Sequence, residues 1–274
     1  PRLRCVLRNQ LAQTIVVGGK AFTEQQIMTA MTVALLKAKG FTPDRKAGMG
    51  SAAVRTAMEN GQIDVYWEYT GTSLGVFNKI TDKFASAADA YKKVKEVDAA
   101  KGIVWLNMSA VNNTYGFAMN RDDAQKRGIV TMSDLAKAVK GGAKLTFASN
   151  AEFYARPDGL PGWQTAYGFE FERDNVKRMD TGLTYSALRD RQVDVAVVFA
   201  TDGRIPAFNF VVLKDDKNFA APYNLTPVVR KEVLDKNPKL ADAPNAVAAK
   251  LNDDNMAKLN ATVAVDKKPP EEVA

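Results

Sequence analysis

The sequence predicts an α/β protein of two lobes that face one cleft. The main observation is an internal repeat, found at residues 57–72 and again at 187–202. In both copies a helix ends, a tight Gln-x-Asp turn follows, and a short strand runs to an aromatic residue, Tyr69 or Phe199. Because ligands bind at the carboxyl ends of strands in open α/β sheets, one such end in each half of the chain predicts two lobes around a shared cleft.

A chance match is the alternative, since Gln-x-Asp-Val is a common connection from a helix to a strand. We favour a true repeat because three features agree at a fixed offset. Gln62 and Asp64 align with Gln192 and Asp194, the closing aromatic residues align, and both copies follow a helical segment.

The composition excludes several classes of function. The 274 residues include no His, and the only cysteine is Cys5. Ser-His and Cys-His nucleophilic sites, Cys/His zinc sites and an internal disulfide are therefore impossible. The net charge of +7 is spread along the chain without a basic block, which argues against a nucleic-acid surface. No apolar run approaches the roughly 18 residues of a membrane-spanning helix.

The first half of the chain alternates strands and helices. A β-branched run at 14–19 predicts a strand, with Lys20 in the loop at its carboxyl end. Thr23 and Gln26 form a capping-box pattern for the helix that follows, to about residue 39. The other elements expected here are an edge strand at 41–48, helices at 52–60, 73–80 and 86–101, and strands at 103–106 and 114–119.

The second half contains a long loop at 150–162 that is rich in turn residues and carries Arg156 beside Asp158. Binding residues concentrate on such loops, although a local surface ion pair is the plain alternative. Thr184 is expected to cap the helix that ends at Arg191. The other expected elements are helices at 131–139, 161–167, 243–251 and 253–263, and strands at 145–149, 176–179, 208–214 and 226–229.

A set of aromatic and polar residues follows the predicted strand ends and loops: Tyr69, Tyr115, Phe199 and Tyr223, with Lys20, Thr72 and Arg156. A quaternary ammonium has no hydrogen-bond donor, so ring faces hold it, at about 0.5–2 kcal/mol for each good contact. A carboxylate instead prefers charged donors. Rings combined with Arg, Lys and a hydroxyl therefore complement a betaine, although each ring taken alone is more often a core residue.

Three motifs, in this order, give the chain a resemblance to a known family: 19–25 (GKAFTEQ), 68–72 (EYTGT) and 156–159 (RPDG). From about Thr14 to Asp266 the chain resembles the glycine betaine/choline-binding proteins of quaternary-amine ABC transporters, also called osmoprotectant-binding proteins. The resemblance implies a type II periplasmic-binding-protein fold, in which two lobes close on a ligand. Each lobe would be a mixed sheet flanked by helices, and two crossover strands would join the lobes.

The implied boundaries place residues 14–114 and 214–266 in the first lobe and 115–213 in the second. Residues 1–13 are expected to be a disordered arm or the remnant of a signal or tag, and 267–274 a frayed tail.

The resemblance also implies a role for each candidate residue. Four tyrosines box the cation in family members, and the matching positions here are Tyr69, Tyr115, Phe199 and Tyr223. Lys20, Thr72 and Arg156 match the residues that hold the carboxylate. Asn113 stands where a family member can carry an acidic residue near the cation. We expect the two departures, Phe199 and Asn113, to weaken or retune the binding of quaternary ammonium groups.

The resulting hypothesis is the substrate-binding component of an ABC importer, periplasmic and monomeric, that delivers a betaine-like or choline-like solute to an inner-membrane permease. It implies no cofactor, metal or catalytic residue. One alternative is a binding protein for a different amino-acid-derived zwitterion. An enzyme on the same scaffold is disfavoured because no phosphate-binding loop or metal motif is present. A transcriptional sensor would need a helix-turn-helix segment, and none is evident.

Overall fold

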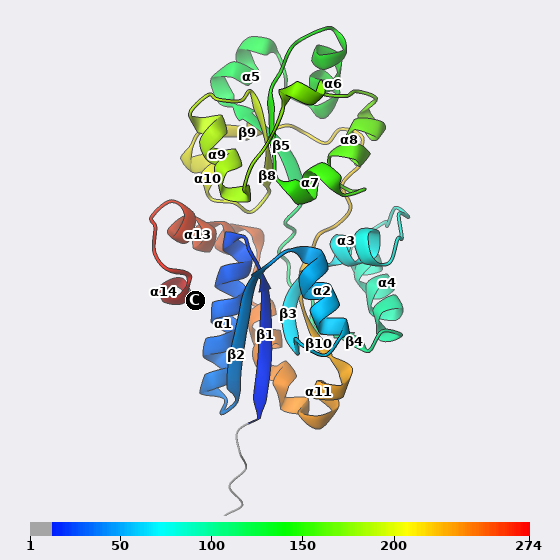
Figure 1. Ribbon diagram of the computed structural model, residues 1–274, viewed down its shortest axis with the longest axis vertical. Helices are drawn as coiled ribbons and strands as arrows, with labels where there is room; N and C mark the ends of the chain where they lie inside the picture. The colour runs from blue at the N-terminus through cyan, green and yellow to red at the C-terminus, as the bar shows by residue number, and fades with distance from the viewer. Residues whose placement is uncertain (1–12) are drawn as a thin grey trace, which may run out of the picture.

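The computed structural model describes residues 13–274, which form two lobes stacked along the long axis of the molecule (Figure 1). We call lobe 1 the part built on the sheet that contains β1, and lobe 2 the part built on the sheet that contains β5. Residues 1–12 of the arm expected at 1–13, including Cys5, lie outside the described residues.

The two sheets have five strands each and the same topology. The order in lobe 1 is β2-β1-β3-β10-β4 and in lobe 2 β7-β6-β8-β5-β9. In both sheets the first three strands are parallel, and the fourth runs antiparallel to its two neighbours. The strands are β1 (Thr14–Lys20), β2 (Thr42–Met49), β3 (Val65–Tyr69), β4 (Ile103–Trp105), β5 (Tyr115–Asn120), β6 (Phe147–Ser149), β7 (Val176–Arg178), β8 (Val195–Phe199), β9 (Phe210–Val212) and β10 (Leu225–Arg230).

Helices flank both sheets (Figure 1). Lobe 1 has α1 (Thr23–Ala38), α2 (Ser51–Glu59), α3 (Thr70–Thr72), the π-helical turn η1 (Ser73–Phe77), α4 (Ala87–Ala99), α11 (Lys231–Lys236), the 3₁₀ turn η3 (Pro238–Ala241), α12 (Asp242–Ala248), α13 (Asp253–Ala264) and α14 (Pro270–Val273). Lobe 2 has α5 (Arg121–Arg127), α6 (Met132–Lys140), α7 (Ala151–Ala155), α8 (Leu160–Tyr167), the 3₁₀ turn η2 (Arg173–Asn175), α9 (Thr181–Arg189) and α10 (Arg204–Ala207). The predicted α/β class with two mixed sheets is confirmed.

The alternation of side chains along each central strand explains why helices cover both faces of the sheets. In β3, Val65 packs into the cluster that contains Leu36 of α1, whereas Tyr66 packs with Met58 of α2 on the other face. Successive residues of a strand point to opposite faces, so a fully buried strand needs a helix on each side. Lobe 2 repeats this arrangement, because Val197 and Val198 of β8 belong to separate clusters.

The internal repeat is visible in the hydrogen bonds as well as in the topology. The carboxylate of Asp64 accepts from the backbone N–H of Val16 at 2.8 Å, and that of Asp194 accepts from the N–H of Thr146 at 2.8 Å. In both lobes the aspartate just before the central strand is thereby fixed to the neighbouring parallel strand. The predicted repeat is therefore structural, since both copies hold the same place in their sheets.

Two antiparallel crossover segments join the lobes, at residues 106–114 and 213–224. The N–H of Asn113 donates to the carbonyl of Tyr223 at 3.0 Å, and the N–H of Tyr223 donates to the side-chain oxygen of Asn112 at 2.8 Å. Asn112 and Asn224 also form an isolated antiparallel bridge. This pairing holds the crossover segments side by side where the lobes meet.

Three expectations about helix starts and loops were wrong. The N-cap of α1 is Phe22, with no side-chain cap from Thr23, and α9 begins at Thr181 rather than behind a Thr184 cap. The loop at 150–162 contains α7, which Asn150 caps by accepting from the N–H of Phe153 at 2.8 Å. Helices α1 and α9 therefore start earlier than their local capping patterns predict.

Further helices were missed, including the short α3 and α10, and the carboxyl-terminal tail differs from the expected frayed segment. The sequence analysis did not predict α5 and α11, which follow β5 and β10 directly. Residues 267–274 instead contain α14, which contacts α1 and pairs Glu271 with Arg45. Pro270 in the first turn and two glutamates behind it favour this short helix.

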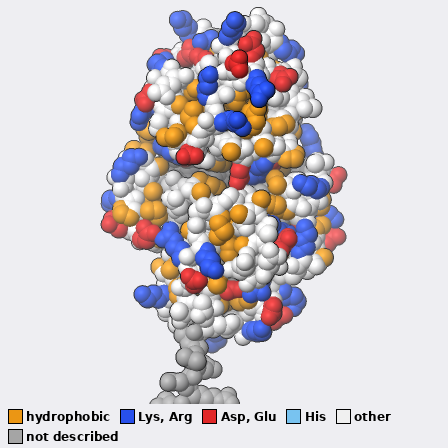
Figure 2. Space-filling model, viewed as in Figure 1, with side chains coloured by type: hydrophobic (Ala, Val, Ile, Leu, Met, Phe, Trp, Pro, Cys, Tyr) orange, Lys and Arg blue, Asp and Glu red, His pale blue; other side chains and the backbone are white. Residues whose placement is uncertain are grey.

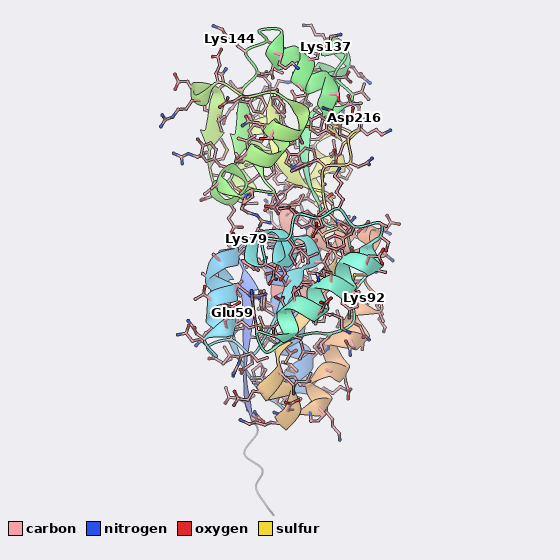
Figure 3. All side chains as sticks on the ribbon, turned by 90° about the vertical axis from the view of Figure 1, so that its right-hand side faces the viewer. Glu59, Lys79, Lys92, Lys137, Lys144 and Asp216 are labelled. Carbon is pink, nitrogen blue, oxygen red and sulfur yellow. The ribbon has the colours of Figure 1, made fainter. Side chains whose placement is uncertain are left out.

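The surface carries charges of both signs over both lobes. On the face shown in Figure 2, basic and acidic side chains are interspersed with apolar ones. Figure 3 shows the charged side chains that it labels on the outside of the lobes, for example Lys92 and Lys137. None of the helices within residues 13–274 combines the length and apolar character that a membrane crossing requires.

We predict that Asp64→Ala destabilises the protein more than Asp194→Ala. The Asp64 side chain is 9% exposed and also pairs with Arg230 at 2.7 Å, whereas that of Asp194 is 29% exposed. Loss of Asp64 leaves the N–H of Val16 and the Arg230 guanidinium without this acceptor, at a cost of about 2–3 kcal/mol, against about 1 kcal/mol for Asp194. Urea unfolding with an unchanged m-value measures both. Equal losses would contradict the unequal burial of the two copies.

Candidate functional site

A cavity of about 490 Å³ lies between the lobes, and every candidate residue of the sequence analysis lines it. These residues are Lys20, Tyr69, Thr72, Asn113, Tyr115, Arg156, Phe199 and Tyr223. The structure therefore brings all of them together. Their role in binding a ligand stays a prediction.

The topology explains why residues so distant in sequence meet. Tyr69 ends β3 and Phe199 ends β8, and both are central strands whose carboxyl ends point to the cleft. Tyr115 begins β5 and is the direct cross-strand partner of Phe199. Asn113 and Tyr223 lie on the crossover segments, where the backbone pairing fixes them beside the strand ends.

Gly71 allows the crossover segment to approach lobe 1 closely. A Cβ atom at this position would lie 2.8 Å from the carbonyl oxygen of Pro222 and 3.0 Å from the ring of Tyr223. Real side chains do not tolerate the shorter of these distances, so a larger residue would push Tyr223 away from the cavity. Glycine in the 68–72 motif is therefore a packing requirement of the site.

An aromatic row lines one side of the cavity and includes a ring that the sequence analysis missed. Phe22 stacks on Phe199 with ring centroids 5.1 Å apart, and its centroid lies 6.1 Å from that of Tyr69. Tyr115 continues the row, 5.3 Å from Phe199 and 6.0 Å from Tyr223. Phe22 lies in the same strand-end loop as Lys20, and this position was the signal that could have identified it.

Arg156 occupies the polar side of the cavity. Its guanidinium makes a two-point ion pair with Asp158, with N···O distances of 2.8 and 2.6 Å, and donates to the hydroxyl of Thr72 across the cleft at 3.3 Å. Burial by itself would lower the pKa of Arg156, but the neighbouring Tyr115 hydroxyl and the Asp158 carboxylate outweigh it and raise the pKa. Burial likewise opposes the charge of Asp158, yet the hydrogen bonds from Arg156 lower its pKa.

Lys20 also lines the cavity, but a buried carboxylate already neutralises its charge. The Lys20 ammonium lies 2.6 Å from the Glu68 carboxylate, and these two residues are 3% and 0% exposed. Glu68 additionally accepts from the Tyr66 hydroxyl and from the N–H of Tyr69. Because an ammonium has three donors, Lys20 keeps hydrogen-bonding capacity beyond this ion pair.

Glu152, which the sequence analysis did not single out, connects the lobes at the rim of the cavity. It comes from α7 of lobe 2 and accepts from the N–H and the hydroxyl of Ser51, at 2.7 and 3.0 Å, at the start of α2 in lobe 1. Helix α2 has no side-chain cap of its own, because its N-cap is Gly50. Glu152 therefore supplies the cap from the opposite lobe, where a negative charge also complements the helix dipole.

The electrostatics of Glu152 agree with this contact. Burial would raise its pKa, but the Ser51 N–H and the positive charge of Lys20 outweigh burial and lower the pKa. Among residues 13–274, no group of three or more His, Cys, Asp or Glu side chains is arranged to hold a metal ion. The site is thus an interlobe pocket lined by aromatic rings and paired charges.

Two mixed α/β sheets around a cleft, joined by two crossovers, define a type II periplasmic-binding-protein fold. Residues 13–274 match the model of one family, described as the substrate-binding domain of ABC-type glycine betaine transport systems. The chain belongs to that family, which consists of binding proteins rather than enzymes.

Relatives extend over nearly the whole chain. A glycine-betaine-binding protein of Pseudomonas aeruginosa is 43% identical over 96% of this chain and 86% of its own length. The glycine betaine-binding protein YehZ of Escherichia coli is 31% identical over 94% of this chain and 87% of its own. The crystal structure of a glycine betaine/carnitine/choline ABC transporter is 29% identical, covers 94% of this chain and 95% of its own, and superposes with a TM-score of 0.74.

We predict that Glu152→Gln favours the open form of the protein. The substitution keeps the size of the side chain but removes the charge at the start of α2, a contribution of about 0.3–1 kcal/mol. The affinity for the ligand should therefore fall about two- to fivefold. Small-angle scattering of the ligand-free protein should show a larger radius of gyration. Glu170→Gln, on the exposed surface of lobe 2, is the matched control; an equal response of both variants would show that the cap does not stabilise closure.

Proposed function

We propose that this chain is the substrate-binding component of an ABC importer and binds glycine betaine, choline or a related quaternary-ammonium solute between its lobes. The observation that carries the proposal is the row of aromatic rings beside Arg156 and Thr72 in one interlobe cavity. The family and the ligands named for the relatives support the same class of solute.

The ring faces are the part of the site suited to the cation. A trimethylammonium group spreads its positive charge over methyl groups that donate no conventional hydrogen bonds, so the negative faces of aromatic rings are its natural partners. Tyr69, Tyr115, Phe199 and Tyr223 supply these faces in our proposal, and Phe22 extends them. Phe199 keeps the ring face but lacks the electron-donating hydroxyl of a tyrosine, and we expect a weaker contribution from it.

The carboxylate of a betaine would bind at the polar side. The Arg156 guanidinium and the Thr72 hydroxyl lie 3.3 Å apart, so one carboxylate can accept from both. Lys20 could add a donor, although its charge is balanced by Glu68. Choline has a hydroxyl in place of the carboxylate and would depend less on Arg156.

Closure follows from ligand contacts on both lobes. A ligand shifts a conformational equilibrium only through its different affinity for the two states. Tyr69 and Thr72 belong to lobe 1, whereas Arg156 and Phe199 belong to lobe 2. A solute that touches all four can do so only when the lobes are closed, and the closed surface is then presented to the membrane permease. Export to the periplasm and a monomeric state belong to the same proposal.

The alternative within this fold is a different amino-acid-derived zwitterion. The neutral Asn113 and the missing hydroxyl at Phe199 favour this alternative, since both reduce the attraction for a quaternary ammonium. Titration of several ligands separates the two possibilities directly.

We predict that isothermal titration detects binding of glycine betaine, choline, carnitine or proline betaine, with proline as the ligand that lacks a quaternary ammonium. Tyr223→Ala should weaken the binding about 30-fold, because one ring face is worth up to about 2 kcal/mol when desolvated. Tyr91→Ala is the matched control, since Tyr91 lies on α4, away from the cavity lining. Silence of the folded wild-type protein toward every quaternary amine would overturn the proposal.

We predict that Arg156→Ala discriminates between ligands. Glycine betaine should lose about 30- to 100-fold in affinity, because a buried charge-assisted contact is worth about 2–3 kcal/mol. Choline, which has no carboxylate, should lose less than about fivefold. The ratio of the two dissociation constants is the readout, because general damage from leaving Asp158 unpaired affects both ligands. An unchanged ratio would show that Arg156 does not hold the carboxylate.

A further inference from the structure

Glu24 is a buried carboxylate just behind the aromatic row, in the first turn of α1. The residue is 2% exposed and accepts four hydrogen bonds. One oxygen accepts from the hydroxyl of Tyr69 at 2.7 Å and from the amide of Asn113 at 3.2 Å. The other accepts from the hydroxyl of Thr201 at 2.5 Å and from the amide of Asn260 at 3.0 Å.

The orientation of the two amides indicates an ionised carboxylate. The oxygen of Asn113 accepts from the N–H of Thr201, which turns its NH₂ group toward Glu24. The NH₂ group of Asn260 also donates to the carbonyl of Thr201, so its orientation is fixed as well. Two amide donors and two hydroxyls match the acceptor-only character of a carboxylate. Burial outweighs the hydrogen bonds and raises the pKa of Glu24, while the four donors each favour the charged form.

Glu24 differs from three other carboxylates around the cavity because it forms no ion pair with any described residue. Glu68 pairs with Lys20, and Asp158 and Glu152 lie within 4 Å of Arg156. Within residues 13–274, no Lys or Arg nitrogen lies within 4 Å of the Glu24 carboxylate, and its hydrogen-bond donors are all neutral. The carboxylate is thus fixed by hydrogen bonds but has no ion-pair partner in this part of the chain. Burying an unpaired charge is costly, so a cation nearby would be stabilising.

Two of the donors connect this charge to the cavity. Tyr69 and Asn113 line the cavity, and their polar groups point back to Glu24. A phenol that donates to a carboxylate becomes richer in electrons, which strengthens the attraction of its ring face for a cation. Glu24 also lines an adjoining hollow of about 450 Å³, which shares Phe22 and Phe199 with the cavity.

We infer that Glu24 is the specificity-determining counter-charge of the site: it selects a positively charged headgroup over an uncharged group of the same shape, acting through Tyr69 and Asn113. The inference rests on the proposed function, since it specifies what the aromatic row recognises. Glu24 does not contact the ligand itself. It orients Tyr69 and Asn113, which line the cavity, and its negative charge acts on the ligand from behind them.

The test compares each ligand with its carbon isostere, in which a tert-butyl group replaces the trimethylammonium group. Glycine betaine is paired with 3,3-dimethylbutanoate and choline with 3,3-dimethylbutan-1-ol. The readout is the charge preference, defined as the dissociation constant of the isostere divided by that of the charged ligand. Glu24→Gln should lower this preference about tenfold for both pairs, because it removes the charge and keeps the shape.

Thr201→Val is the matched control. It removes a hydrogen bond from lobe 2 to Glu24 but leaves the carboxylate in place. It should weaken both members of each pair by the same factor and leave the charge preference unchanged. Tyr69→Phe is the second test variant: it breaks the link between ring and carboxylate, and should lower the preference about threefold.

The outcomes are distinguishable. If wild-type protein binds no quaternary amine, the proposed function fails, and this inference with it. If wild-type protein binds the charged ligands and Glu24→Gln keeps the full charge preference, only the inference fails and Glu24 has a structural role. If Glu24→Gln does not fold, Tyr69→Phe decides by the same ratio, and an unchanged preference in that variant overturns the inference.

Discussion

The pairing of the two crossover segments is the constraint on which the site depends. Hydrogen bonds between Asn112, Asn113 and Tyr223 hold the segments antiparallel where they pass between the lobes. The pairing brings the carboxyl ends of the central strands of both sheets to the same cleft, and it places Asn113, Tyr115 and Tyr223 there directly. Residues more than a hundred positions apart thus line one cavity without any long loop reaching across it.

Two cationic side chains inside the cleft are balanced by carboxylates of the protein itself. Arg156 pairs with Asp158, and Lys20 pairs with Glu68. Isolated buried charges are costly, so each pair offsets part of the cost of burying its two charges. A zwitterion brings both signs and no net charge, so it can enter without leaving one sign uncompensated. This balance suits a betaine better than an anion, which would add to the negative charge of Glu24, Glu68 and Asp158.

The sequence predicted the parts of the site that are tied to strand ends, because the repeat marks those ends in the chain. Tyr69 and Phe199 were found in this way, Arg156 was found from its turn-rich loop, and the family resemblance then gave Thr72 and Arg156 their implied roles. Glu24 was not found, because a glutamate in the first turn of a helix is usually explained by the helix dipole. Its burial depends on Thr201 and Asn260, which come from lobe 2 and α13, and no local pattern predicts such a meeting.

Helix starts were predicted poorly for a related reason. Capping patterns such as Thr23 with Gln26 describe an isolated helix, whereas the starts of α1 and α2 lie at the cleft. There the partners come from elsewhere: Glu152 of lobe 2 caps α2, and Glu24 of α1 accepts from Tyr69 and Thr201. Donors and acceptors that would be local in an ordinary helix pair with other elements here, and two of these partners, Glu152 and Thr201, belong to lobe 2. The failure of the local rule therefore marks the surfaces that meet on closure.

These interlobe contacts also set the balance between the open and closed forms. Three hydrogen bonds link the lobes across the cleft: Glu152 with Ser51, Glu24 with Thr201 and Arg156 with Thr72. Each contact raises the fraction of the protein in which the lobes are closed. The apparent dissociation constant of a ligand that binds the closed form is the intrinsic one divided by this fraction, so each contact lowers it. Too many such contacts would close the cleft before the solute enters. Glu152 is only half-buried at the rim, which keeps its contribution modest. The hydrogen bond from Thr201 of lobe 2 to the buried Glu24 forms only when the lobes are in contact. Because Glu24 also accepts from Tyr69, lobe closure is linked to the negative charge behind the Tyr69 ring.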